Sequence, residues 1–238
     1  MILQLANLLM AVTITGAVLP DPAPAGPDRP YEPPVGGPEN LDTLDVDVAP
    51  DGGGHNGVTI TFDRRSRTES GEKPAAARRF VFLFDRSVRL RPEAFPVCDE
   101  AALREWGPAA CPSGSRVGSG SARYHGSAGT QEVLAFNGRT PDGTPLVLVS
   151  IPASKTVLPQ TLERAAPPYQ KKYRIALDEI LPPNATPPQD RGATTRFTLS
   201  FGAARGSVSY VEAPPRRLDF ALWSEFVTGQ RLMTPAAQ

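Results

Sequence analysis

The sequence contains little cysteine, histidine or lysine, and neither sign of charge is in excess. Of its 238 residues, two are cysteine and two are histidine, and Lys plus Arg equals Asp plus Glu at 25 each. With no net charge, no overall electrostatic field draws the chain to nucleic acid, so we expect no nucleic-acid partner. The few histidines and cysteines also give little support for a metal site, and we predict no metal or cofactor.

Helix-period patterns are scarce, whereas alternating apolar residues are common. With 40% hydrophobic and 21% charged residues, the chain is suited to a packed core. The alternation predicts about nine short strands separated by Gly- and Pro-rich turns. They are expected around residues 44–48, 58–62, 80–84, 132–136, 146–151, 173–177, 196–201, 207–211 and 218–226.

This pattern is typical of a mainly β protein, and we predict an antiparallel β-sandwich with one short helix inside a disulfide loop. The run at residues 79–85 (RFVFLFD) is apolar on both faces, which favours a central strand covered on each side. Residues 202–206 resemble a short hairpin connection, so we expect the last three strands to be sequential neighbours.

Cys98 and Cys111 enclose the short helical stretch, which ends at Gly107-Pro108. We expect a structural disulfide between them, because C-x12-C lacks the close spacing of a redox C-x-x-C pair. Asp99 is expected to cap the helix and Leu103 and Trp106 to turn inward, with Glu100 and Arg104 one turn apart.

Residues 3–19 are apolar and uncharged, and Ala23-Pro24-Ala25 follows with the small-x-small pattern that signal peptidase accepts. We interpret residues 1–25 as a secretory signal, although no Lys or Arg precedes Arg29. The alternative is a retained signal anchor, for which the run is short of the roughly 20 residues of a spanning helix. No other contact with a membrane is expected.

The remaining chain divides by composition. Residues 26–40 are rich in Pro and Gly, which favours an extended linker. Residues 41–228 are expected to form the β-sandwich domain, and residues 229–238 a flexible C-terminal tail.

No motif predicts an enzymatic activity. The Gly- and Ser-rich run at residues 114–121 fails the G-x-S-x-G spacing of a nucleophile elbow and precedes no predicted helix. We assign no catalytic residue. A secreted hydrolase remains the alternative, and it requires His55 or His125 within hydrogen-bond reach of both a hydroxyl and a carboxylate.

Two groups of side chains are weak candidates for a ligand-binding rim. The first is basic and suits an anionic glycan or a lipid headgroup; the second places tyrosines beside lysines. Solvated loop charges are the simpler interpretation of the first group, and a strand entry that of the second. The candidates are Arg64, Arg65, Arg67, Tyr169, Lys171, Lys172 and Tyr173.

Residues 95–120 contain F-P-x-C, a short helix, G-P-x-A-C-P and S-x-V-G-S-G, and the pattern continues through residues 135–138 and 209–214. This segment resembles a family of uncharacterised secreted proteins from actinobacteria. The resemblance implies an exported β domain with a Cys98–Cys111 bridge and implies no activity.

Together these observations predict an exported, non-catalytic envelope or extracellular domain. It would act as a binding or structural module for an unidentified cell-surface component or protein.

Overall fold

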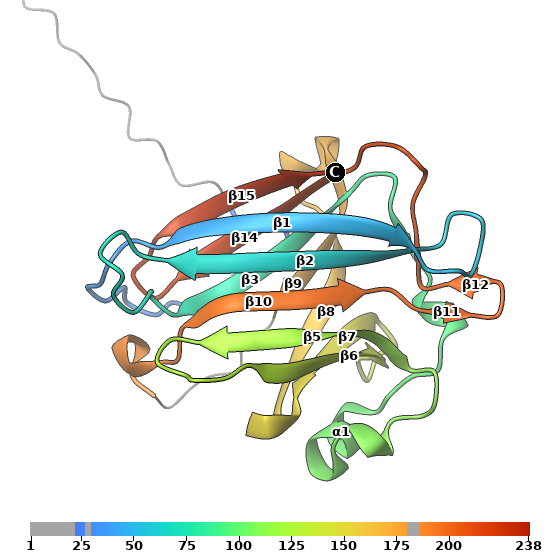
Figure 1. The fold of residues 1–238 in the computed structure, drawn as a ribbon, viewed down its shortest axis with the longest axis horizontal. Coiled ribbons are helices and arrows are strands. Elements are labelled where there is room, and N and C mark those ends of the chain that lie inside the picture. Colours follow the sequence, from blue (N-terminus) through green and yellow to red (C-terminus); the bar gives the residue numbers. More distant parts are fainter. Residues whose placement is uncertain (1–21, 27–29, 180–185) are drawn as a thin grey trace, which may run out of the picture.

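The computed structural model describes residues 22–26, 30–179 and 186–238 (Figure 1). The fold is mainly β and antiparallel, as predicted, with one α-helix in the described part of the chain. The long strands are β1 (Leu41–Pro50), β2 (Val58–Arg67), β3 (Ala77–Asp85), β5 (Arg116–Tyr124), β6 (Gln131–Arg139), β7 (Pro145–Ile151), β8 (Thr156–Arg164), β9 (Tyr173–Glu179), β10 (Thr194–Phe201), β14 (Asp219–Phe226) and β15 (Arg231–Ala237).

The remaining elements are short. They are β4 (Arg89–Leu90), β11 (Ala204–Arg205), β12 (Val208–Ser209), β13 (Val211–Glu212), the helix α1 (Glu100–Trp106) and the 3-10 turns η1 (Pro92–Ala94), η2 (Pro108–Ala110), η3 (Pro152–Ser154), η4 (Tyr169–Lys171) and η5 (Pro188–Asp190).

Both layers of the sandwich belong to one continuous sheet with the strand order β1-β2-β10-β5-β6-β7-β8-β9-β3-β14-β15. The sheet folds over itself, so that β1, β2, β10 and β5 lie in front of β3, β9 and β8 in Figure 1. Its two edge strands come together: Asn40 N donates to Gln230 Oε1 over 2.8 Å, and Gln238 Nε2 donates to Val48 O over 3.3 Å. The edge strands β1 and β15, which lie at opposite ends of the strand order, are therefore close to one another in space.

The core lies between the layers and is rich in phenylalanine. The ring of Phe62 on β2 lies 5.1 Å from that of Phe82 and 5.5 Å from that of Phe84, both on β3. Phe201 on β10 contacts Phe84 at 6.0 Å. These aromatic contacts between strands that are not paired hold the layers together.

The strand pairing differs from the prediction in one respect. Residues 204–209 do form a small hairpin of β11 and β12, but β10 pairs with β2 and β5, and β14 pairs with β3 and β15. The expectation that the last three strands are sequential neighbours was wrong. A turn signal identifies a local reversal and carries no information on which distant strand completes the sheet.

The cysteine loop has the predicted form. Cys98 and Cys111 form a disulfide around α1, Asp99 caps the helix by accepting from Ala102 N over 2.8 Å, and Leu103 is buried. Trp106, which we expected to face inward, is 70% exposed. The helix is only two turns long, so a single leucine is enough to anchor it to the outer face of β6, β7 and β8.

Asn137 on β6 fixes the segment before the helix. Its Nδ2 atom donates to the carbonyls of Pro92, Phe95 and Pro96 at 2.9–3.2 Å, and its Oδ1 accepts from the Tyr210 hydroxyl over 3.2 Å. Residues from three separate segments of the sequence, 92–96, 137 and 210, therefore meet at one structural contact inside the fold.

Candidate functional site

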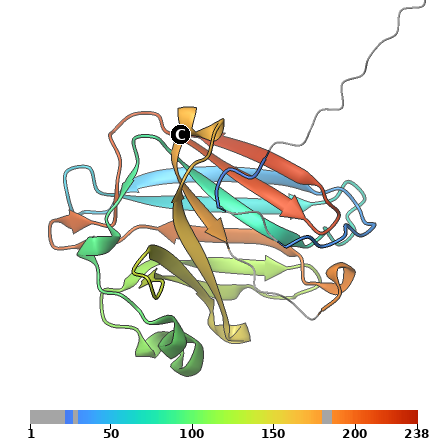
Figure 2. The same cartoon turned by 180° about the vertical axis from the view of Figure 1, so that it is seen from behind.

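The candidate functional site is the outer face of β3, β9 and β14, where residues 22–26 lie (Figure 2). Ala25 is 2% exposed, and Pro24 is also buried. Ala25 belongs to a separate apolar cluster outside the main core, with Val81, Leu83, Ala165, Tyr169, Tyr173, Ala176, Ala221 and Trp223. We call the residues that hold this segment, Arg79, Ala166, Tyr169, Tyr173, Asp178 and Trp223, the outer-face site.

Three hydrogen bonds bind the backbone carbonyls of the segment. The Tyr169 hydroxyl donates to the Pro22 carbonyl over 2.9 Å, Ala166 N donates to the Pro24 carbonyl over 2.6 Å, and Arg79 Nη2 donates to the Ala25 carbonyl. Carbonyls are the hydrogen-bonding groups that a proline-rich segment keeps, because proline has no N–H to donate. The site is thus suited to an extended proline-containing peptide.

A buried ion pair forms the floor of the site. Arg79 Nε lies 2.9 Å from Asp178 Oδ1, and Arg79 Nη2 lies 2.6 Å from Asp178 Oδ2. Both side chains are at least 97% buried, so the pair is shielded from solvent and rigidly oriented. This two-point contact aims the guanidinium at the Ala25 carbonyl.

The site also restricts side-chain size. Gly26 has a φ of +64°, and a Cβ atom there would lie 2.6 Å from Asp178 Oδ2 and 2.8 Å from Arg79 Nη2. Ala25 is packed among the apolar side chains of the cluster, so a longer side chain there would have to displace them. The site therefore contacts backbone carbonyls of the segment and has room only for small residues at two successive positions.

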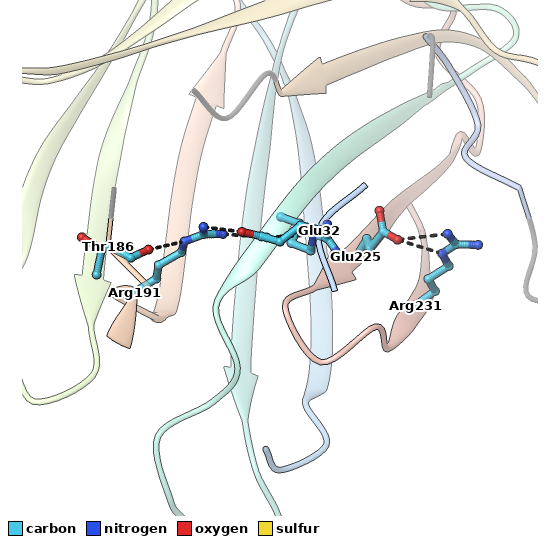
Figure 3. A network of polar contacts seen from close by, with 6 residues as sticks. Glu32, Thr186, Arg191, Glu225 and Arg231 are labelled. Carbon is cyan, nitrogen blue, oxygen red and sulfur yellow. Dashed lines mark hydrogen bonds and ion pairs between the residues drawn. The ribbon is translucent and has the colours of Figure 1, made fainter. Parts of the chain in front are cut away.

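Residues further along the chain also contact the domain, at Glu32 and Val35. Glu32 forms an ion pair with both Arg191 and Arg78, and Val35 N donates to the Val227 carbonyl over 3.0 Å. Figure 3 shows Glu32 and Arg191 pointing toward one another, with Arg191 Nε also donating to the Thr186 carbonyl over 3.1 Å. A second pair in the same view, Arg231 with Glu225, joins β15 to β14.

The first group of candidate rim residues does not form one surface. Arg64, Arg65 and Arg67 alternate along β2, so Arg64 points into the interior and is 2% exposed, while the other two face solvent. Arg64 Nε donates to Asp42 Oδ2 over 2.8 Å, and its guanidinium lies 4.4 Å from the Phe80 ring. Arg64 is thus not part of a solvent-facing rim.

The second group lies at the outer-face site. Tyr169 and Tyr173 are buried in its apolar cluster, and Lys171 and Lys172 are exposed beside it. Sequence reasoning missed Arg79 and Asp178 as partners of the segment, because they are separated by 99 residues and neither lies in a motif.

A second charged group faces the interior behind the site. Glu179 follows Asp178 on β9, and burial raises its pKa to about 7, an effect that the nearby Arg64 opposes and Asp178 strengthens. Gln160, its register partner on β8, is 1% exposed, and its Oε1 atom has no hydrogen-bond partner among the residues that the structure describes.

Neither histidine has the geometry that the hydrolase alternative requires. His55 lines a hollow of about 770 Å³ between a Gly-rich loop and residues 213–218, and His125 is exposed after β5. In the described part of the chain, no side-chain hydrogen bond joins either histidine to a hydroxyl or a carboxylate. The same residues contain no cluster of three or more metal-ligating side chains.

No helix among the described residues is long and apolar enough to cross a membrane. Comparison with protein-family models, with curated proteins and with solved structures found no match. The resemblance to secreted actinobacterial proteins therefore stays a prediction.

Proposed function

We propose that the protein is an exported, non-catalytic envelope or extracellular domain that binds an extended peptide rich in proline and small residues. The binding surface is the outer-face site. In the full-length chain its own residues 22–26 occupy this site and fasten the domain to the segment before them.

One observation carries this proposal: the carbonyls of Pro22, Pro24 and Ala25 each accept a hydrogen bond from the site. Aromatic side chains line it, and surfaces that recognise proline-rich peptides commonly combine such rings with hydrogen-bond donors. The disulfide fits an oxidising compartment outside the cytoplasm.

Burial of Ala25 has a consequence for processing. Cleavage after Ala25 would remove Pro22, Pro24 and Ala25 and thereby expose the apolar side chains that they cover. We therefore favour retention of residues 22–26 in the mature protein, and we propose the signal-anchor alternative, in which residues 3–19 are retained as well. Intact mass spectrometry of the protein from membranes and culture fluid, with and without reduction, tests this: a mature chain that begins at Gly26 would overturn retention, and a reduced cytosolic chain would overturn export.

Peptide binding is tested by emptying the site and refilling it. Trp223 belongs to the site, and the other tryptophan, Trp106, is exposed, so Trp106→Phe leaves one fluorescent reporter. In that background, Ala25→Arg is expected to displace the segment, since an arginine side chain does not fit the buried position. A synthetic peptide of residues 20–26 should then bind and change the Trp223 emission saturably.

Two controls make the test selective. The same peptide should not alter emission from the protein with Ala25 intact, because the attached segment competes at high effective concentration. A peptide carrying Ala25→Arg should not bind the emptied site. Equal responses to both peptides, or no response to either while Ala25→Arg remains folded by circular dichroism, would refute peptide binding.

The hydrolase alternative is not favoured by the arrangement of His55 and His125. We retain the non-catalytic binding module as the proposal.

A further inference from the structure

We propose that a cluster of exposed basic side chains beside the outer-face site is a docking surface for an anionic lipid bilayer. We call it the basic rim, and it comprises Arg86, Arg164, Lys171, Lys172, Arg174 and Arg217. The inference rests on the proposed retention of residues 3–26, the signal-anchor alternative, and is independent of peptide binding in trans.

The members of the basic rim lie close together. Arg86 N donates to the Lys172 carbonyl over 3.2 Å, and Ala165 N, next to Arg164, donates to the Arg174 carbonyl over 3.1 Å. Arg217 is near enough to Lys172 for its charge to oppose protonation of that lysine. The rim therefore joins the ends of β8 and β9 to the segment before β14.

The positive charge of the rim is largely uncompensated. Asp219 pairs with Lys172 at 3.1 Å, and Asp85 accepts from Arg216 over 2.9 Å. Within the described ranges, Arg86, Arg164, Lys171, Arg174 and Arg217 have no ion-pair partner. A chain with no net charge thus carries a local positive surface, and the overall balance of 25 basic and 25 acidic residues conceals it.

The position of the rim relative to the N-terminal segment identifies its partner. Pro22 is bound by Tyr169, which shares the 3-10 turn η4 with Lys171. The apolar run of residues 3–19 ends three residues before Pro22, a span of at most about 10 Å for an extended chain. Since this is about one Debye length at physiological ionic strength, a bilayer that holds the run lies within electrostatic reach of the rim.

Hydrogen exchange of the full-length protein on vesicles tests the proposal, after its mass has shown that residues 3–26 are present. The apolar run should attach the chain to phosphatidylcholine vesicles and to vesicles that also contain phosphatidylglycerol. We expect slower exchange in peptides covering residues 164–174 on the anionic vesicles only, and salt should reverse the effect.

Charge reversal supplies the decisive comparison. Lys171→Glu with Arg174→Glu should lower the lipid-dependent protection roughly tenfold or more. The matched control, Arg123→Glu with Arg205→Glu, alters exposed arginines on β5 and β11 and should preserve it. Equal exchange on both lipids, or equal loss in both double variants, would overturn the basic rim as a bilayer-docking surface. A failure of peptide binding in trans would leave these outcomes unchanged.

Discussion

Asp178 and Glu179 are consecutive on β9, yet they lie on opposite faces of the sheet. Asp178 faces outward and pairs with Arg79 at 2.6 Å beneath Ala25, whereas Glu179 faces the interior near Arg64. One strand thereby carries the charged floor of the outer-face site and a buried carboxyl behind it. Asp178 also raises the pKa of Glu179, so the two faces are electrostatically coupled.

Removing Arg79 should destabilise the domain strongly. Arg79→Met leaves Asp178 buried without its main cation, and we expect a loss of about 3–5 kcal/mol in the free energy of unfolding, measured by urea denaturation. Arg65→Met provides the control, because Arg65 is exposed and its pair with Asp63 should contribute less than about 1 kcal/mol. Similar losses in the two variants would contradict the structural role assigned to the buried pair.

Stability should fall as pH rises from about 4.5 to about 7. The folded chain keeps the Glu179 proton up to a pKa of about 7, whereas the unfolded chain releases it near 4.5. The folded state thus binds more protons between these values, and the free energy of unfolding should decrease by roughly 1–3 kcal/mol over that interval. Glu179→Gln should remove this pH dependence. If the free energy of unfolding, measured by denaturation at pH 5 and pH 8, changes by the same amount in both proteins, Glu179 is not its source.

The disulfide should contribute to stability without affecting the outer-face site. Replacing both cysteines by serine should lower the free energy of unfolding by about 3 kcal/mol, the entropy associated with closing a loop of this length. In the Trp106→Phe background, Trp223 emission should stay the same, because α1 packs against β6, β7 and β8 rather than against β3 and β14. A shifted emission maximum in the folded variant would show that the two regions are linked.

Gly26 should not tolerate a methyl group. Gly26 and Gly126 both have positive φ angles, +64° and +74°, but only at Gly26 would a Cβ atom meet other atoms, those of Asp178 and Arg79. Gly126→Ala should therefore show the backbone penalty alone, about 1 kcal/mol. Gly26→Ala should in addition release residues 22–26, detected as limited proteolysis before residue 30; resistance equal to that of Gly126→Ala would argue against the fit described for the segment.

The sequence contained enough information to predict the fold class, because strand alternation and the cysteine spacing are local signals. β8 was missed since Pro159 and Gln160 interrupt its pattern, and β15 falls within residues 229–238, where we expected a flexible tail. Gly118 and Gly120 concealed β5 as a strand: Cβ atoms there would clash with the backbone of β10, so the glycines permit close strand approach.

The outer-face site was predictable only in part. Tyr169 and Tyr173 were selected because aromatic and basic residues stand together in the sequence. Their joining with Arg79 and Asp178 depends on β3 and β9 being neighbours, a long-range pairing that no local pattern specifies. From its composition alone, the proline-rich segment was predicted to be a linker. Its contacts with the domain depend on the outer-face site, which is built from strands distant in the sequence.

The amide proton of Ala166 provides the most direct test of the account, because it donates to the Pro24 carbonyl over 2.6 Å. Its hydrogen-exchange rate should be measured by NMR in the full-length protein and in the Ala25→Arg variant. We predict slow exchange in the former and exchange faster by at least tenfold in the latter, with amides of β6 and β7 unchanged. Fast exchange of Ala166 in both proteins would contradict a bound N-terminal segment.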